Sequence, residues 1–249
     1  MASHFARWEI TQTKNRVYRL PSKLVELSAS LAEKRRRRYL AARTLLAEMM
    51  LRIYGIPHLP EMTLDAHGRP YFVDPDLPDF SISYAGNTVG VLLAEEGCRA
   101  GLDMEIVRAH SRQTLEQCLH SFSAGEKTWI GAQSDFSEAC TQIWTLRQSI
   151  LKMTGEGSGG CDVLSLHPAS GRLRSSALMN IQAICDIDTL MVWSCALSPG
   201  ADRLHLWKYD GNEEWVPIQS FNGYSLNIGP HALRLTSLAS PRIEKQYYL

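Results

Sequence analysis

The sequence lacks the features that mark nucleic-acid-binding, membrane and secreted proteins. Its 26 basic and 26 acidic side chains cancel, so the formal net charge is zero and a general attraction to nucleic acid has no support. No uninterrupted apolar run approaches roughly 18 residues, the length that spans a bilayer, and residues 1–9 lack the apolar core of a signal peptide. We therefore expect a cytoplasmic protein that neither enters a membrane nor binds nucleic acid.

Cysteine and histidine spacings typical of metal sites are also missing. No two of the six cysteines follow the Cys-x-x-Cys pattern, and several fall in apolar runs, where a reduced thiol packs as a small hydrophobic group. None of the eight histidines has ligand spacing. A zinc site of thiolates and imidazoles is therefore not indicated, and a reducing compartment is.

The sequence does contain a pair of carboxylates inside an apolar run. Asp103 and Glu105 stand two residues apart between residues 100 and 107, a segment that the pattern predicts to be a strand. Alternate residues of a strand point to the same face, so both carboxylates project from one side. Two hard oxygen ligands side by side suit Mg²⁺. For an isolated Asp-x-Glu, the competing interpretation is a solvated sheet face.

A long amphipathic helix is predicted over residues 136–154, where apolar residues recur at helical spacing. A second row, Trp144, Gln148 and Lys152, follows at every fourth position and stacks an aromatic ring, an oxygen ligand or hydrogen-bonding group, and a cation. Carboxylates for a metal and a lysine on a helix suit a phosphate ester, whose charge must be neutralised while one oxygen leaves. For Lys152 taken alone, the competing interpretation is an ordinary lysine near the end of a helix, where it interacts favourably with the helix dipole.

These segments resemble the motifs of the 4′-phosphopantetheinyl transferases, in particular the larger type that activates surfactin synthetase. The three motifs of that family are matched in order by SISYAG at residues 81–86, GLDME at 101–105 and WTLRQSILK at 144–152. Weaker matches are RTLL at 43–46, GRPY at 68–71 and FSAGE at 122–126. The resemblance runs from about residue 36 to about residue 197.

The resemblance implies an α+β enzyme with a pseudo-twofold arrangement of two similar halves, each a long helix packed on a small antiparallel sheet. Residues 1–107 would form the first half, residues 108–200 the second, and residues 201–249 an extension of unknown role. Such an enzyme transfers 4′-phosphopantetheine from coenzyme A to a serine of an acyl or peptidyl carrier protein and releases 3′,5′-ADP. We expect a monomer whose partners are coenzyme A and the carrier protein.

The resemblance also assigns roles to individual residues. Mg²⁺ would be held by Asp103, Glu105 and Gln148. The nucleotide phosphates would be held by Arg43, Arg69, Ser83 and Tyr84, while Lys152 would neutralise or protonate the leaving phosphate. Glu126, or a water on the metal, would deprotonate the acceptor serine. The spacing of Glu126 from Ser123 is also that of a helix capping box, which would be a purely structural role.

Three positions depart from the pattern of the family, and at one of them Arg147 stands for lysine and keeps the cation. Tyr84 stands where the family has histidine, and a tyrosine hydroxyl can donate to a phosphate but carries no positive charge. Gln148 stands where the family has glutamate, and an amide oxygen holds a hard dication less well than a carboxylate. These changes motivate an alternative, a non-catalytic protein that binds coenzyme A or a carrier protein. The retention of Asp103, Glu105 and Lys152 argues against it.

A run of five cations, KRRRR at residues 34–38, lies on a single helix that the apolar pattern predicts over about residues 28–54. Such a run is usually a solvated helix face. In the family that the chain resembles, cations at this place contact the phosphates of coenzyme A. A local positive patch would also suit the binding of an acidic carrier protein. The sequence leaves these three interpretations open.

Overall fold

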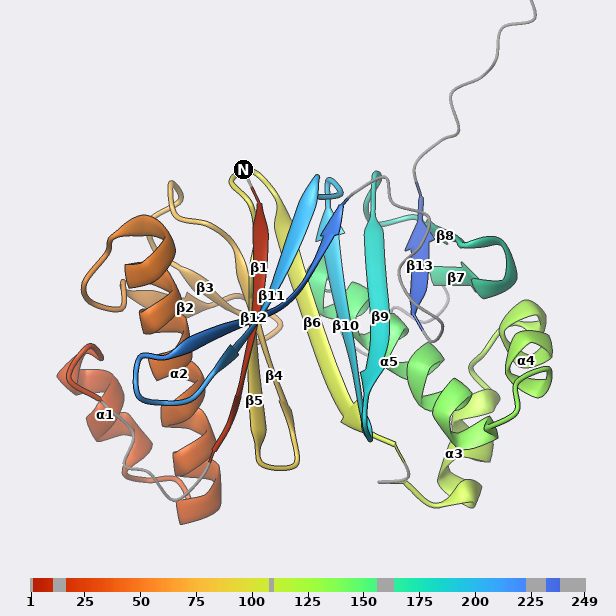
Figure 1. Cartoon of the computed structure of the whole chain (residues 1–249), viewed down its shortest axis with the longest axis horizontal. Coiled ribbons are helices and arrows are strands. Elements are labelled where there is room, and N and C mark those ends of the chain that lie inside the picture. The colour runs from red at the N-terminus through yellow and green to blue at the C-terminus, as the bar shows by residue number, and fades with distance from the viewer. Residues whose placement is uncertain (1, 11–16, 108–109, 156–163, 223–231, 238–249) are drawn as a thin grey trace, which may run out of the picture.

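The computed structural model describes residues 2–10, 17–107, 110–155, 164–222 and 232–237 of the chain. This part of the chain is a mixed α and β structure with five α-helices and three sheets (Figure 1). None of its helices is both long and apolar enough to cross a membrane. The helices are α1 (Ser22–Ser28), α2 (Glu33–Tyr54), α3 (Arg112–Leu119), α4 (Ala124–Gly131) and α5 (Phe136–Thr154), with a short 3₁₀ helix at Pro168–Ser170. The strands are β1 (Ser3–Glu9), β2 (Met62–Leu64), β3 (Pro70–Phe72), β4 (Phe80–Ala85), β5 (Thr88–Leu93), β6 (Arg99–Ile106), β7 (Leu164–His167), β8 (Arg172–Ser175), β9 (Gln182–Asp188), β10 (Met191–Ser198), β11 (Arg203–Tyr209), β12 (Trp215–Asn222) and β13 (Leu233–Thr236).

The first large sheet has five strands in the order β12-β11-β1-β5-β4, and α2 covers one of its faces. Alternate residues of a strand point to opposite sides, so β1 supplies side chains to two clusters. Ala6 and Trp8 pack with Leu45 and Met49 of α2, whereas Phe5 belongs to the cluster on the other face. The sheet is therefore buried on both sides at β1, whereas most residues of its edge strand β12 are exposed.

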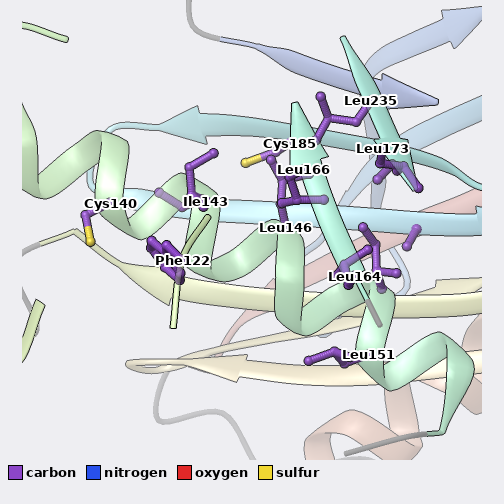
Figure 2. Close-up of a cluster of buried hydrophobic side chains, with 14 of the residues drawn as sticks. Phe122, Cys140, Ile143, Leu146, Leu151, Leu164, Leu166, Leu173, Cys185 and Leu235 are labelled. Atoms are coloured by element: carbon purple, nitrogen blue, oxygen red, sulfur yellow. The ribbon is translucent and has the colours of Figure 1, made fainter. Parts of the chain in front are cut away.

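The second large sheet has six strands in the order β6-β10-β9-β13-β8-β7. Helix α5 packs on it through the apolar row that the sequence predicts. Figure 2 shows Ile143 and Leu146 of α5 among Leu166, Cys185 and Leu235 of the sheet, all of them buried. Each fully buried side chain of the Leu or Ile class contributes about 1.5–3 kcal/mol, so this cluster anchors α5 firmly.

The two large sheets lie side by side between α2 and α5 (Figure 1). A third cluster, which includes Phe5, Met104 and Trp193, joins them. At one place the joint is polar, because β4 and β6 belong to different sheets and serine side chains connect them. The Ser81 hydroxyl accepts from the Leu102 N–H at 2.9 Å, and the Ser83 hydroxyl accepts from the Met104 N–H at 3.0 Å. The serines thus satisfy strand amides that have no ladder partner on this side.

Gly101 allows α5 to approach β6 closely. A Cβ atom at this position would lie 1.9 Å from the backbone carbonyl oxygen of Ser149 and 2.7 Å from Cβ of Met153. Only glycine fits here, since the clash is with the backbone of the helix. The glycine before the two carboxylates therefore sets how near α5 comes to them.

Most of the predicted elements are present. The helix predicted over residues 136–154 is confirmed as α5, and the strand predicted over residues 100–107 is confirmed as β6. The single helix predicted over residues 28–54 is wrong at its start, because α1 and α2 are separated by residues 29–32. The first strand of the chain is β1 (Ser3–Glu9), and residues 11–16 lie outside the described residues.

The described strands after residue 200 are distributed over both large sheets. β11 pairs in parallel with β1, and β12 continues the first sheet beyond it. β13 lies between β9 and β8 in the second sheet. The division of the chain into two halves and an extension, at residues 107 and 200, stays a prediction. The described strands after residue 200 belong to both large sheets.

Candidate active site

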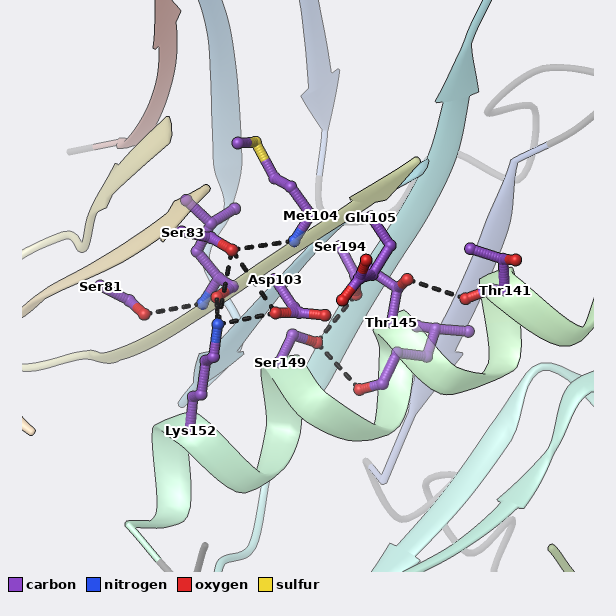
Figure 3. A network of polar contacts seen from close by, with 12 residues as sticks. Ser81, Ser83, Asp103, Met104, Glu105, Thr141, Thr145, Ser149, Lys152 and Ser194 are labelled. Atoms are coloured by element: carbon purple, nitrogen blue, oxygen red, sulfur yellow. Dashed lines mark hydrogen bonds and ion pairs between the residues drawn. The ribbon is translucent and has the colours of Figure 1, made fainter. Parts of the chain in front are cut away.

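Asp103 and Lys152 form an ion pair where α5 crosses β6. Lys152 Nζ lies 2.6 Å from Asp103 Oδ1, and it also donates to the Leu102 carbonyl at 3.1 Å and to the Ser83 hydroxyl at 3.4 Å. Figure 3 shows these groups pointing toward one another, with Ser149 of α5 bonded to Ser194 of β10 beside them at 2.8 Å. The helix and two strands thus converge on one carboxylate.

The second carboxylate oxygen of Asp103, Oδ2, does not share in these hydrogen bonds. Oδ2 is buried and has no hydrogen-bond partner among the described residues. Burial raises the pKa of Asp103 above its ordinary value, although the Lys152 ammonium acts in the opposite direction. An unpaired buried carboxylate oxygen costs free energy unless a donor or a cation reaches it. This oxygen is the observation on which the fit of a metal rests.

Glu105 lies on the same strand two residues further on, and its side chain is about one-third exposed. Its pKa is raised, first by burial and then by the negative charge of Asp103. His110 Nε2 lies 3.7 Å from Glu105 Oε2. A cation beside Asp103 and Glu105 would offset both the burial of these carboxylates and the repulsion that Asp103 exerts on Glu105, so the pair fits a divalent metal.

The remaining predicted ligand, Gln148, is provided by α5. It is partly exposed and lies one turn before Lys152, where both line a cavity of about 270 Å³ together with Arg69 and Ser81. No group of three or more His, Cys, Asp or Glu side chains within the described ranges could hold a metal. A metal on Asp103 and Glu105 would therefore draw its other oxygens from Gln148, from water or from a substrate.

Arg43 and Tyr84 come together from α2 and β4. Arg43 Nη1 donates to the Tyr84 hydroxyl at 3.1 Å, and its guanidinium lies 3.5 Å from the centre of the Tyr39 ring. Tyr84 is among the exposed large side chains. The pair thus presents a cation and a hydroxyl at the surface, two groups that bind phosphate oxygens.

Arg69 and Ser83, the other two residues predicted to hold phosphates, have structural partners. Arg69 Nη2 pairs with Asp79 Oδ2 at 2.5 Å and also donates to the carbonyls of Phe80 and Ala100. Ser83 is buried and its hydroxyl accepts from β6. Both residues join β4 to β6, so this geometry gives their phosphate-binding roles no support, although Arg69 also borders the 270 Å³ cavity.

Glu126 has the structural role that its spacing from Ser123 indicates. The Ser123 N–H donates to Glu126 Oε2 at 2.6 Å, and the capping box is complete. Arg147 Nη1 lies 2.8 Å from Glu126 Oε1, and the side chains of this pair are 3% and 0% exposed. Both carboxylate oxygens are used inside the protein, so the prediction of Glu126 as a base is not supported.

A larger cleft of about 800 Å³ opens beside the start of α2. Lys34 and Arg38 of the basic run line it, together with Arg7 of β1 and Lys208 of β11. The sequence alone does not indicate Arg7 and Lys208, which join the basic run only because β1 and β11 are neighbours in the sheet. No local pattern carries that information.

No protein-family model matches the sequence. A 4′-phosphopantetheinyl transferase of Salmonella typhi, AcpT, is 30% identical over 168 residues, which are 66% of this chain and 79% of the relative. The chain belongs to the 4′-phosphopantetheinyl transferase superfamily. Within it, AcpT of Escherichia coli K12 is 32% identical over 125 residues, 49% of this chain and 59% of that relative.

A second protein of Escherichia coli K12, with the name uncharacterized protein YieE, is 40% identical over 245 residues, 96% of this chain and 97% of its own length. The match to YieE therefore includes most of residues 201–249. The alignment with YieE thus extends over sequence beyond residue 200, where the similarity to AcpT over 66% of the chain leaves more of this chain unmatched.

Proposed function

We propose that the protein is a transferase of the larger, surfactin-synthetase-activating type. It would move 4′-phosphopantetheine from coenzyme A to a serine of an acyl or peptidyl carrier protein in the presence of Mg²⁺. The similarity to AcpT supports the reaction class. The two large sheets, each with its long helix, are compatible with pseudo-twofold halves. We further propose that the enzyme acts as a monomer.

The metal in this proposal is held by Asp103 and Glu105, with Gln148 as a neutral third ligand. When bound, Mg²⁺ supplies positive charge against the pyrophosphate of coenzyme A. Arg43 and Tyr84 hold a nucleotide phosphate, since their guanidinium and hydroxyl meet at the surface. Lys152 supplies a mobile ammonium for the phosphate that leaves with 3′,5′-ADP.

The single observation that carries the proposal is the orphaned oxygen of Asp103. A buried aspartate that served only to pair with Lys152 would have its second oxygen satisfied by the protein. Here Oδ2 is left without a partner while a second carboxylate stands beside it. That arrangement is favourable when a cation binds both.

The test is an incubation of the protein with coenzyme A, Mg²⁺ and apo carrier proteins, followed by intact mass spectrometry. Wild type should add the mass of one phosphopantetheine group to a carrier protein. Asp103→Asn should lower the rate by at least about a hundredfold, because it removes a charge-stabilising group from the reacting centre, and should leave the fold intact. Glu116→Gln, on the exposed side of α3, is the matched control. Asp103→Asn with wild-type activity would refute the site.

The alternative function is a non-catalytic partner that binds coenzyme A or a carrier protein. Gln148 and Tyr84 favour it, because a third carboxylate and a cation are missing. The same experiment separates the two functions. A protein that binds coenzyme A in calorimetry, yet modifies none of the carrier proteins offered at any Mg²⁺ concentration, would establish the alternative.

A further inference from the structure

We propose that Lys152 and the divalent metal are competing cations for Asp103. Lys152 holds the carboxylate while the metal is absent, and it is released toward a substrate phosphate when the metal binds. This inference rests on the proposed function, because it takes Asp103 as a metal ligand. It adds an order of events, in which metal binding precedes the contact between Lys152 and the phosphate.

The hydrogen bonds of Lys152 carry the first step. An ammonium group has three N–H donors. Nζ has three oxygen partners, namely Asp103 Oδ1 at 2.6 Å, the Leu102 carbonyl at 3.1 Å and the Ser83 hydroxyl at 3.4 Å. No donor is left for a phosphate in this arrangement. Lys152 can serve a substrate only after it gives up some of these partners.

The two partners differ in their freedom to move. The side chain of Asp103 is 7% exposed, whereas that of Lys152 is 39% exposed. Lys152 also borders the 270 Å³ cavity, so its four-carbon stem has space to turn. The aspartate is fixed by β6, and the lysine is the group that moves.

The local charges explain why Lys152 and the metal do not remain at Asp103 together. A dication on Asp103 and an ammonium on the same carboxylate would repel each other at short distance, in a site where burial reduces screening. Without a metal, Lys152 is the cation nearest to Asp103 and neutralises one of the two carboxylates. With a metal, Asp103 and Glu105 are both neutralised and the ammonium is no longer needed there.

The experiment measures binding of Mn²⁺ alone, by calorimetry and in the absence of coenzyme A. Lys152→Met removes the competing charge and keeps the apolar stem, so its Kd for Mn²⁺ should be at least about tenfold lower than that of wild type. Lys152→Arg, which keeps the charge, should stay within about threefold of wild type. Lys127→Met, an exposed lysine of α4, is the matched control and should change nothing.

A second measurement uses only the wild type, so it does not depend on whether a variant folds. Acetylation of lysines with a small reagent, quantified by mass spectrometry, should increase several-fold at Lys152 when Mn²⁺ is added, and should stay constant at Lys127. Lys152 labelling that is unchanged or reduced by Mn²⁺, or Lys152→Met that binds Mn²⁺ no better than wild type, would overturn the competition. Absence of Mn²⁺ binding in both wild type and Lys152→Met would overturn the metal site as well. If Asp103→Asn abolishes binding while Lys152→Met leaves it unchanged, only the competition fails.

Discussion

His4 couples the stability of the first sheet to pH. Its imidazole lies against the rings of His205 and Trp207, and Trp207 Nε1 donates to its Nδ1 at 3.1 Å. Burial, then the neighbouring His205 and Arg52, lower the pKa of His4 from 6.5 to about 4. The folded protein therefore keeps this histidine neutral over a range in which the unfolded chain protonates it.

The direction of the effect follows from proton binding. Between pH 6.5 and about 4 the unfolded chain binds a proton that the folded chain does not, so the free energy of unfolding falls as the pH falls through this window. His4→Gln keeps a hydrogen-bond acceptor for Trp207 but does not titrate. Its melting temperature should fall less than that of wild type between about pH 7 and about pH 4.5. His120→Gln, at an exposed position, should behave as wild type; equal slopes for His4→Gln and wild type would contradict the assignment.

Helices α4 and α5 are tied together by the buried pair of Glu126 and Arg147. Glu126→Ala leaves a buried arginine without its carboxylate and removes half of the capping box, so it should lower the free energy of unfolding by about 3–5 kcal/mol in urea titration. The double variant Glu126→Leu/Arg147→Met should recover much of this loss, because no charge is then buried. A loss below about 1 kcal/mol for Glu126→Ala would show that the pair is not structural.

The activity of Glu126 variants separates the two roles considered for this residue. Glu126→Gln keeps an oxygen for the Ser123 N–H and removes the charge. With a structural glutamate, the folded fraction of this variant should transfer at nearly the wild-type rate. A large loss of rate at unchanged stability would restore Glu126 as a base.

Local sequence patterns predicted the elements that depend on local rules. Apolar residues recur at helical spacing over residues 136–154 and Gly155 follows them, and α5 begins and ends where that pattern does. The Ser123 capping box depends only on residues three apart, and it is present. The pairing of Ser3 with Leu204 joins residues that are far apart in the sequence, so no local sequence pattern can predict it.

In the candidate site, too, the sequence predicted the arrangement of residues that local spacing determines. Two-residue spacing on a strand places Asp103 and Glu105 on one face, and helical spacing places Lys152 on the side of α5 that meets them. The uses of Ser83 and Arg69 could not be predicted, because they depend on how the edges of two sheets meet. Their partners, the Met104 N–H and Asp79, become visible only in three dimensions.

The whole molecule assembles a cleft whose lining includes four cations, from α2, β1 and β11, and two carboxylates, Glu9 and Asp188, the second of which pairs with Arg7. Lys34 lies at the start of α2, and Lys208 lies on β11; both are exposed and line the 800 Å³ cleft. Within the described ranges neither lysine has a salt-bridge partner. An acidic carrier protein would be attracted to this cleft by charge.

The double variant Lys34→Gln/Lys208→Gln should raise the Michaelis constant for the carrier protein by about tenfold. It should leave the constant for coenzyme A nearly unchanged and weaken the dependence of the rate on salt. Arg35→Gln, an exposed cation of the same run that does not line the cleft, is the control. A change in the constant for coenzyme A alone would identify the cleft as a phosphate site, and no change in either would leave a solvated surface.

The position of β11 determines when the first sheet can be completed during translation. β1 is synthesised first, but one of its two neighbours in the sheet, β11, comes from residues 203–209. During translation β1 can pair with β5 early, while its other edge keeps unpaired backbone groups until β11 has left the ribosome. The nascent chain therefore carries an open sheet edge until residues 203–209 have been synthesised. That edge is where a holdase chaperone, or a second nascent copy, would first find a strand to bind.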